Sequence, residues 1–365
     1  MKKNSKSYTQ AYESLKDENN QPIIDIKKIE SFGFPSKPSC MCYSPLLGLL
    51  AVGTQTGKIF IVGKPGFSIS GDLMNEQMNI FYIEFIAFKN KIVTLCRTFS
   101  AYYVVTWLFN DLKSTRVESD HIIEITNKIG QITTACIGID YDTIYMGTKR
   151  AEVYFYSVSL TKFHKFVLTE EIVLHSYCLK KYCTKLGSVE SLCPGNFENP
   201  KLIIGYSSGI IIIWDIRTMK ISSFIAKKDQ LFSVCWGKNE SLFVSSHSNG
   251  LICCWSFTKL SKSESIHGNY SPVPFNPREK VPCQSIKKII WRDTFFIFQG
   301  GLPNSILFDR NILSIMSGGT ITEIIEVGST ILDFFDVSAD SSNSQIIGKN
   351  SFFLIILTEF ELVSV

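Results

Sequence analysis

Short apolar segments separated by small polar turns recur along this chain. Each copy has an apolar strand, a turn rich in Gly, Ser and Thr, and a second apolar strand; four copies align, beginning at Ala51, Tyr145, Ile203 and Val244. Their second strands cover Lys58–Val62, Glu152–Tyr156, Ile210–Trp214 and Leu251–Trp255. β-Branched and aromatic residues favour strands, and glycine supplies the positive φ of a tight hairpin turn. The pattern predicts a repeated β-hairpin.

A cysteine precedes each hairpin at a nearly constant distance. Cys42, Cys136 and Cys235 stand 11 residues before Gly53, Gly147 and Ser246, and Cys193 stands 12 residues before Gly205. A free cysteine behaves as a small apolar residue in a protein core. We therefore interpret the four cysteines as one position on an inner strand, not as ligands.

Weaker copies extend the repeat to seven units. They run from Phe85 to Cys96 and into Tyr102–Trp107, from the strand Ile286–Trp291 to Gly301, and from Leu332 to Phe352–Leu357 and Leu362–Val365. Turn anchors then fall near residues 53, 96, 147, 205, 246, 301 and 358. A four-stranded propeller blade takes about 40–45 residues, which these gaps match or modestly exceed. The sequence predicts an all-β, seven-bladed WD-repeat-like β-propeller over residues 22–365, after a polar tail over residues 1–21.

The last copy ends at its third strand, which would leave an open sheet edge. The apolar segment Pro22–Ile26 could supply the fourth strand and close the ring. On this hypothesis, deleting residues 1–30 lowers the melting temperature sharply, and an unchanged melting temperature refutes ring closure by this segment.

Composition and charge narrow the function classes. The chain is 45% hydrophobic and carries a net charge of only +4, with Lys and Arg scattered along it, so it can build a large core and shows no basic face for nucleic acid. The sequence shows neither an apolar run of membrane-helix length nor a signal-peptide h-region. We expect a cytoplasmic protein whose eleven cysteines are mostly free thiols.

The residues that could carry chemistry favour structural roles. Cys40 with Cys42, or adjacent Cys253 and Cys254, offers too few ligands for zinc. A looser set with ligand-like spacing leaves a metal site open as an alternative, in an insert expected to be a loop or outer strand: His164, His175, Cys178 and Cys183.

His247 next to serines resembles a Ser/His pair, but it occupies the turn position of Thr54, Thr148 and Tyr206 in the other copies. Trp107, Trp214 and Trp255 recur at the end of the third strand and are expected to pack between blades. The sequence suggests no acid that would orient His247, and it shows no glycine-rich loop of the kind that binds phosphate. We therefore expect no enzyme, and assign no catalytic, cofactor-binding or metal residues; partner-binding residues stay unknown, because loops carry binding in such folds.

Three ordered stretches carry a family resemblance. The first is FGFPSKPS (32–39) with LAVGTQTGKI (50–59) and GKPG (63–66). The second is LIIGYSSG (202–209) with WDIR (214–217), SVCW (233–236) and SSHSNG (245–250). The third is FIFQGGL (296–302) with LSIM (313–316). Together they resemble the N-terminal propeller of the lethal giant larvae/tomosyn family, with the syntaxin-binding tomosyn branch the closer likeness, over nearly the whole chain.

The resemblance implies a non-catalytic cytosolic regulator of vesicle exocytosis. Its implied partners are syntaxin-class SNAREs, with myosin or Rab-linked proteins in some members, and it associates peripherally with the plasma membrane through them. Full-length members carry a second propeller, and tomosyns add a SNARE-like coiled coil. This chain shows no heptad run, so SNARE mimicry is not carried over, and the stretch Leu302–Ile312 departs from the family pattern. The chain is expected to be a fragment, a short isoform or an incomplete gene model. A generic propeller adaptor unrelated to SNAREs is the alternative function.

Overall fold

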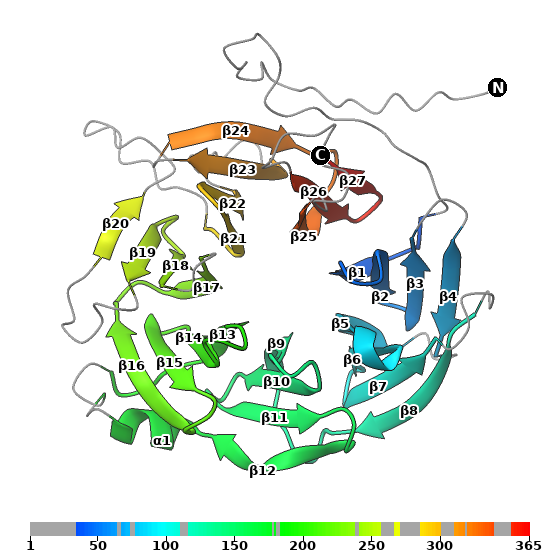
Figure 1. Ribbon diagram of the computed structural model, residues 1–365, viewed down its shortest axis with the longest axis horizontal. Coiled ribbons are helices and arrows are strands. Elements are labelled where there is room, and N and C mark those ends of the chain that lie inside the picture. Colours follow the sequence, from blue (N-terminus) through cyan, green and yellow to red (C-terminus); the bar gives the residue numbers. More distant parts are fainter. Residues whose placement is uncertain are drawn as a thin grey trace. The chain divides into compact units, whose positions relative to one another are not determined.

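The computed structural model describes residues 34–63, 67–73, 77–109, 116–176, 179, 183–237, 241–256, 266–270, 285–300, 310–317, 320–338 and 352–365. The fold is all-β, with seven blades arranged as a β-propeller (Figure 1). Each blade is an antiparallel sheet whose strands follow one another in chain order. The predicted fold class is therefore confirmed.

The first three blades contain β1 (Pro38–Ser44), β2 (Leu49–Thr54), β3 (Lys58–Val62) and β4 (Ser68–Asp72); β5 (Asn79–Ile86), β6 (Lys91–Arg97), β7 (Tyr102–Leu108) and β8 (Glu118–Glu124); and β9 (Ile132–Ile137), β10 (Thr143–Thr148), β11 (Val153–Ser157) and β12 (Lys162–Leu168). Blades four and five contain β13 (Val189–Pro194), β14 (Lys201–Tyr206), β15 (Ile210–Asp215) and β16 (Lys220–Ala226); and β17 (Leu231–Trp236), β18 (Leu242–His247), β19 (Ile252–Ser256) and β20 (Ile266–Tyr270). Blade six contains β21 (Ile289–Arg292), β22 (Phe295–Gln299), β23 (Ile312–Ser317) and β24 (Thr320–Glu326). Blade seven contains β25 (Ile331–Ser338), β26 (Phe352–Thr358) and β27 (Leu362–Ser364).

The four repeat cysteines occupy one structural position, as predicted. Each lies on the first strand of its blade, opposite the second-strand residue two places before the glycine or serine anchor; the pairs are Cys42–Ala51, Cys136–Tyr145, Cys193–Ile203 and Cys235–Val244. Their side chains are buried or partly buried. They therefore act as small core residues.

The glycine anchors differ in one respect from the expectation. Gly53 and Gly147 lie inside the second strand of their blades, not in the turn. A Cβ at Gly147 would stand 2.5 Å from Val189 Cγ1 on the next blade, so glycine is needed there for close approach between blades. The hairpin turn glycine is a later residue, such as Gly57 at φ 76°.

The blades form two compact units. The first combines the described parts of 1–128 and 326–365, which are blades one, two and seven. Its main core lies between blades one and two and includes Ile80 and Trp107. A second cluster joins Met41, Leu50 and Val52 of blade one to Leu357 of blade seven. Blades one and seven thus share a core.

The second unit, residues 129–325, contains blades three to six. Separate apolar cores fill the spaces between successive blades: one around Leu202 and Trp214, one around Phe243 and Trp255, and one around Phe296 and Phe298. Trp107, Trp214 and Trp255 all lie on the third strand of their blades in these cores, which confirms their predicted packing role.

A short helix, α1 (Glu170–His175), occupies the insert between blades three and four, where the sequence favoured a loop or outer strand. Thr169 Oγ1 accepts a hydrogen bond from the Ile172 amide and caps it, and two glutamates fill its first turn. Six residues are too few to show a helical period. A 3₁₀ turn, Ala87–Lys89, joins β5 to β6.

Blade seven has three strands among the described residues. Pro22–Ile26, the segment expected to close the ring, lies outside the described residues, so both this closure and the domain bounds at residues 21 and 22 stay predictions. Within the described part of the chain, no helix has the length and apolar character to cross a membrane.

Candidate protein-binding surface and the polar network of blade five

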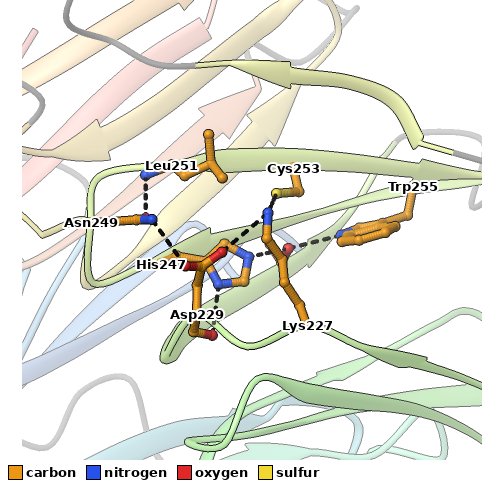
Figure 2. A network of polar contacts seen from close by, with 8 residues as sticks. Lys227, Asp229, His247, Asn249, Leu251, Cys253 and Trp255 are labelled. Carbon is orange, nitrogen blue, oxygen red and sulfur yellow. Dashed lines mark hydrogen bonds and ion pairs between the residues drawn. The ribbon is translucent and has the colours of Figure 1, made fainter.

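His247 belongs to a buried polar network, not to an exposed turn (Figure 2). It is the last residue of β18, and its Nε2 lies 2.9 Å from Ser245 Oγ. Trp255 Nε1 on the neighbouring strand donates to the same oxygen at 2.8 Å. His247 Nδ1 lies 3.3 Å from the Asp229 carbonyl. Ser245 is thus shared by an indole and an imidazole, which fixes both rings inside the blade.

This arrangement does not support nucleophilic catalysis. The third group at the imidazole is a main-chain carbonyl, whereas a triad needs an orienting acid. Burial lowers the pKa of His247 to about 4, with the nearby Lys227 charge acting in the same direction. A neutral imidazole with both nitrogens engaged inside the protein stabilises the blade. Its equivalence to Thr54, Thr148 and Tyr206 is confirmed, since each ends the second strand of its blade.

The tryptophan at this position has a different hydrogen-bond acceptor in blade two and none in blade four. Trp107 Nε1 donates to Thr94 Oγ1 at 3.0 Å in blade two. In blade four the residue that corresponds by strand register to Thr94 and Ser245 is Ile204, which offers no acceptor. The buried Trp214 Nε1 accordingly has no hydrogen-bond partner. An unmet buried donor costs roughly 1–3 kcal/mol, so blade four carries a local defect.

The alternative metal set is dispersed. His164 lies on β12, His175 ends α1 with its Nδ1 2.8 Å from the Glu171 carbonyl, and Cys178 lies outside the described residues. Among the residues that the structure describes, no three His, Cys, Asp or Glu side chains converge on a common point. Burial also raises the pKa of Cys40, Cys42 and Cys96, the last to about 12, which disfavours the thiolate form that binds metals.

The most distinctive surface feature lies on blades three and four. It is formed by the loops that join the first strand to the second and the third strand to the fourth in each blade. Tyr141 and Phe197, in the β9–β10 and β13–β14 loops, are 43% and 61% exposed, and their rings lie 6.4 Å apart. Leu160 and Met219, in the β11–β12 and β15–β16 loops of the same blades, are 61% and 40% exposed. We call these four residues the loop surface. Alternating strand direction brings all four loops to the same edge of their blades.

Polar side chains fix the shape of the blade-three loops through hydrogen bonds. Asp140 accepts hydrogen bonds from the Asp142 and Thr143 amides and from the Thr143 hydroxyl. Asp142 in turn accepts from Ser157 and Ser159, which ties the β9–β10 loop to the β11–β12 loop. Tyr141, between the two aspartates, has φ 51°, a left-handed conformation that bulky residues rarely adopt. The loop therefore presents this ring outward at a cost in backbone strain.

The blade-four loops are built by the same means. Asn196 Oδ1 accepts from the Glu198 and Asn199 amides and shapes the turn that carries Phe197. Asp215 Oδ1 accepts from the Thr218 amide at 2.8 Å, which lowers the pKa of this carboxyl. Arg217 reaches across to the Phe197 carbonyl at 3.1 Å. Met219 sits at φ 55°. The β13–β14 and β15–β16 loops are thus joined by a hydrogen bond, and each exposes one apolar side chain, Phe197 and Met219 respectively.

A shallow depression of about 390 Å³ extends this surface. Its lining is mostly apolar and includes Met219 of the loop surface, with the remaining residues Phe166, Ile172, Ser176, Trp214, Lys220 and Ile221. Phe166 of β12 stacks on Trp214 at 5.6 Å, and α1 supplies Ile172, which is partly exposed. Figure 1 shows α1 beside β16 on the outside of blade four. A partner side chain could enter this depression while contacting the loop surface.

Sequence reasoning missed this surface. Isolated exposed apolar residues are common, and only the spatial pairing of Tyr141 with Phe197 makes these two notable. A usable signal was the bulky residue flanked by two aspartates at 140–142, since aspartates that organise a turn force the residue between them outward.

The fold defines the chain as a seven-bladed β-propeller. The family model "LLGL: LLGL2" matches residues 266–365. The chain is 29% identical to lethal(2) giant larvae protein homolog 1 of Mus musculus over 94% of its length, and 24% identical to lethal(2) giant larvae protein of Drosophila melanogaster over 86%. It is 27% identical to LLGL scribble cell polarity complex component 2 of Homo sapiens over 96%. The chain is similar to these proteins over most of its own length, and the comparisons support the likeness to the lethal giant larvae family.

The chain spans about a third of the length of these relatives, covering 34% of the mouse protein, 35% of the human one and 27% of the Drosophila one. The three named relatives represent the lethal giant larvae branch. The preference for the tomosyn branch, drawn from the motifs, stays a prediction.

Proposed function

We propose that this chain is a non-enzymatic scaffold that binds protein partners through the loop surface of blades three and four. The observation that carries the proposal is the exposed aromatic pair Tyr141 and Phe197, held by hydrogen-bonded loops. Exposing two adjacent aromatic rings to water is unfavourable, and tyrosine is frequent at binding hot spots. Rigid loops reduce the entropy lost on binding.

The class of partner is proposed from the likeness to the lethal giant larvae/tomosyn family. One matched relative is named as a component of the scribble cell polarity complex, and we propose a corresponding scaffolding role here. At finer detail we propose that the chain binds syntaxin-class SNARE helices and so regulates vesicle exocytosis. It would act in the cytoplasm and reach the plasma membrane through its partners, with myosin or Rab-linked proteins as further partners.

The chemistry of the surface suits an amphipathic helix. The apolar face of such a helix would cover Tyr141 and Phe197, and one of its side chains would enter the depression beside Met219 and Trp214. Lys220 at the rim of the depression is exposed and could pair with a carboxylate on the partner. Aromatic anchors beside a polar rim are the usual composition of a specific interface.

Retention of syntaxin-class cytoplasmic helices on immobilised protein tests the proposal. The unmodified chain should retain them, and the double variant Tyr141→Ser, Phe197→Ser should weaken binding at least tenfold. Phe99→Ser is the control, because Phe99 on the β6–β7 loop of blade two is an aromatic residue even more exposed than Tyr141 and Phe197. Equal binding by the double variant would exclude the loop surface as the site.

Failure to retain any syntaxin-class helix would exclude the SNARE role for this chain. A generic adaptor would still require the loop surface to bind some other protein. Cross-linking from a photoreactive residue at position 160, read against the same residue at position 99, distinguishes that case. Cross-links to a protein other than a SNARE at position 160 alone would support the adaptor, and none at either position would overturn the scaffold proposal.

A further inference from the structure

Lys227 and Cys253 make an unusually close contact in the blade-five network. Lys227 Nζ lies 2.6 Å from Cys253 Sγ (Figure 2). Hydrogen bonds from nitrogen to oxygen span about 2.7–3.2 Å, and sulfur is a larger atom than oxygen. The two atoms are therefore closer than an ordinary N–H···S hydrogen bond would place them.

The surrounding structure holds both partners in place. Cys253 is fully buried on β19 and faces Ser245 across the sheet. Lys227 lies in the connection between β16 and β17, and its amide donates to the Gly209 carbonyl at 3.2 Å. Its side chain is only 17% exposed, and its ammonium lies 3.6 Å from an Asp229 carboxylate oxygen. The amine is thus aimed from a fixed backbone position onto the sulfur.

The contact is selective between two adjacent cysteines. Cys254 follows directly on the same strand, so its side chain leaves the opposite face of the sheet and joins the core around Phe296 and Phe298. Cys253 instead joins the core around Trp255. The adjacent lysine, Lys228, is exposed. Cys254 and Lys228 are therefore internal controls, because each has the same residue type as its neighbour in the contact but a different environment.

We propose that Lys227 and Cys253 are a site of oxidative modification, at which a single oxygen atom becomes the bridge of a covalent Lys–NH–O–S–Cys cross-link. Two atoms that share a bridging oxygen lie well inside van der Waals contact, which is about 3.5–4.0 Å for carbon atoms. The observed separation places nitrogen and sulfur near the bridged distance before any oxidation. Little movement is then needed for the bond to form.

Dioxygen is the oxidant in this reaction. The Lys227 ammonium first releases one proton to solvent. The thiol, the resulting neutral amine and one O₂ molecule then give the bridge and one water molecule. The S–H bond and one N–H bond break, and S–O and O–N bonds form. Sulfur and nitrogen each lose two electrons, and the four electrons reduce O₂. One of its oxygen atoms enters the bridge, and the other leaves as water with the two released protons.

The cross-link would tie the β16–β17 connection to the third strand of blade five. The loop that the cross-link closes contains β17 and β18. Closing this loop lowers the conformational entropy of the unfolded chain and so stabilises the folded state. The oxidised protein should then melt a few degrees higher than the reduced protein. A thiol reductant would restore the amine and the thiol, which makes the change reversible.

Mass spectrometry of the full chain tests the site. Protein kept in air-equilibrated buffer should contain a species heavier by about 14 Da than protein kept anaerobically with dithiothreitol, since one oxygen is gained and two hydrogens are lost. Trypsin should fail to cleave after Lys227 in that species. The peptides that contain Lys227 and Cys253 should be recovered as one cross-linked product, and dithiothreitol should release them.

Four variants locate the bond. Cys253→Ser and Lys227→Arg should each abolish the heavier species, whereas Cys254→Ser and Lys228→Arg should keep it. Circular dichroism confirms that each variant retains its sheet content. The unmodified chain alone can refute the proposal: an unchanged mass in air, oxygen added to Cys253 without linkage to Lys227, or unhindered cleavage after Lys227 would each overturn it.

Discussion

Trp255 Nε1 donates a hydrogen bond of 2.8 Å to Ser245 Oγ on the adjacent strand, and both groups are buried. The serine also contacts His247 Nε2, so one hydroxyl satisfies two rings of blade five. Blade two repeats the tryptophan contact with Thr94. A buried polar group that satisfies several partners makes a blade sensitive to single substitutions.

Replacing Ser245 with alanine should lower the free energy of unfolding by about 1–3 kcal/mol, because two buried ring nitrogens lose a partner. Guanidinium denaturation followed by tryptophan fluorescence measures the change. Ser241→Ala, an exposed serine before β18, is the control and should change stability little. Equal effects of the two substitutions would mean that the network contributes nothing specific.

In blade four, Ile204→Thr should be at least as stable as Ile204→Val. The two side chains have the same shape, but only threonine can accept the unpartnered Trp214 indole N–H. At an ordinary core position the threonine hydroxyl costs about 1–3 kcal/mol relative to valine. The pair Ile212→Thr and Ile212→Val, at a fully buried residue of β15, supplies that reference. The same threonine penalty at both positions would refute the assigned defect.

Stability should fall on acidification through His247. Burial lowers the pKa of its imidazole from 6.5 to about 4, so the unfolded chain takes up this proton more readily than the folded one. The loss begins near pH 6.5, levels off near pH 4, and amounts to roughly 3 kcal/mol. Denaturation midpoints between pH 4 and 7.5 should show a flatter profile for His247→Gln. The exposed His164→Gln should keep the original slope.

Glu84 should have the opposite pH dependence. Burial of this residue on β5 raises the pKa of its carboxyl from 4.5 to about 7, so the folded state retains the proton longer than the unfolded state. The stabilisation is fully present below about pH 4.5 and is lost, by roughly 3 kcal/mol, as the pH rises to about 7. Glu84→Gln should raise stability at pH 8 and change it little at pH 4.5. Glu124→Gln, an exposed glutamate on β8, should do neither.

The repeat made the propeller predictable, whereas its surface chemistry depended on contacts that the repeat does not encode. Cys42 and Cys136 could be placed on inner strands because the same spacing recurs around each hairpin. His247 was expected in a turn, since position alone could not show that β18 would continue to it and bury it against Ser245.

Contacts between different hairpins could not be predicted from the sequence for a related reason. Tyr141 and Phe197 come together only because the first–second strand loops of neighbouring blades lie at one edge. Lys227 lies in the connection between two blades and contacts Cys253 on a later strand, and the hairpin repeat gives no information about such a contact. A local period specifies strands, whereas these pairs depend on how one blade is placed against the next.

Tyr43 of blade one stacks on Phe335 of blade seven, so the core shared by these blades can form only after the last blade has been synthesised. Most of the described sequence separates these residues, so the face of blade one that receives blade seven emerges from the ribosome long before its cover exists. That face must stay exposed, or be held by a chaperone, until the final strands arrive. The step that joins them carries the largest loop-closure cost in this unit, and we expect it to be among the last and slowest in folding.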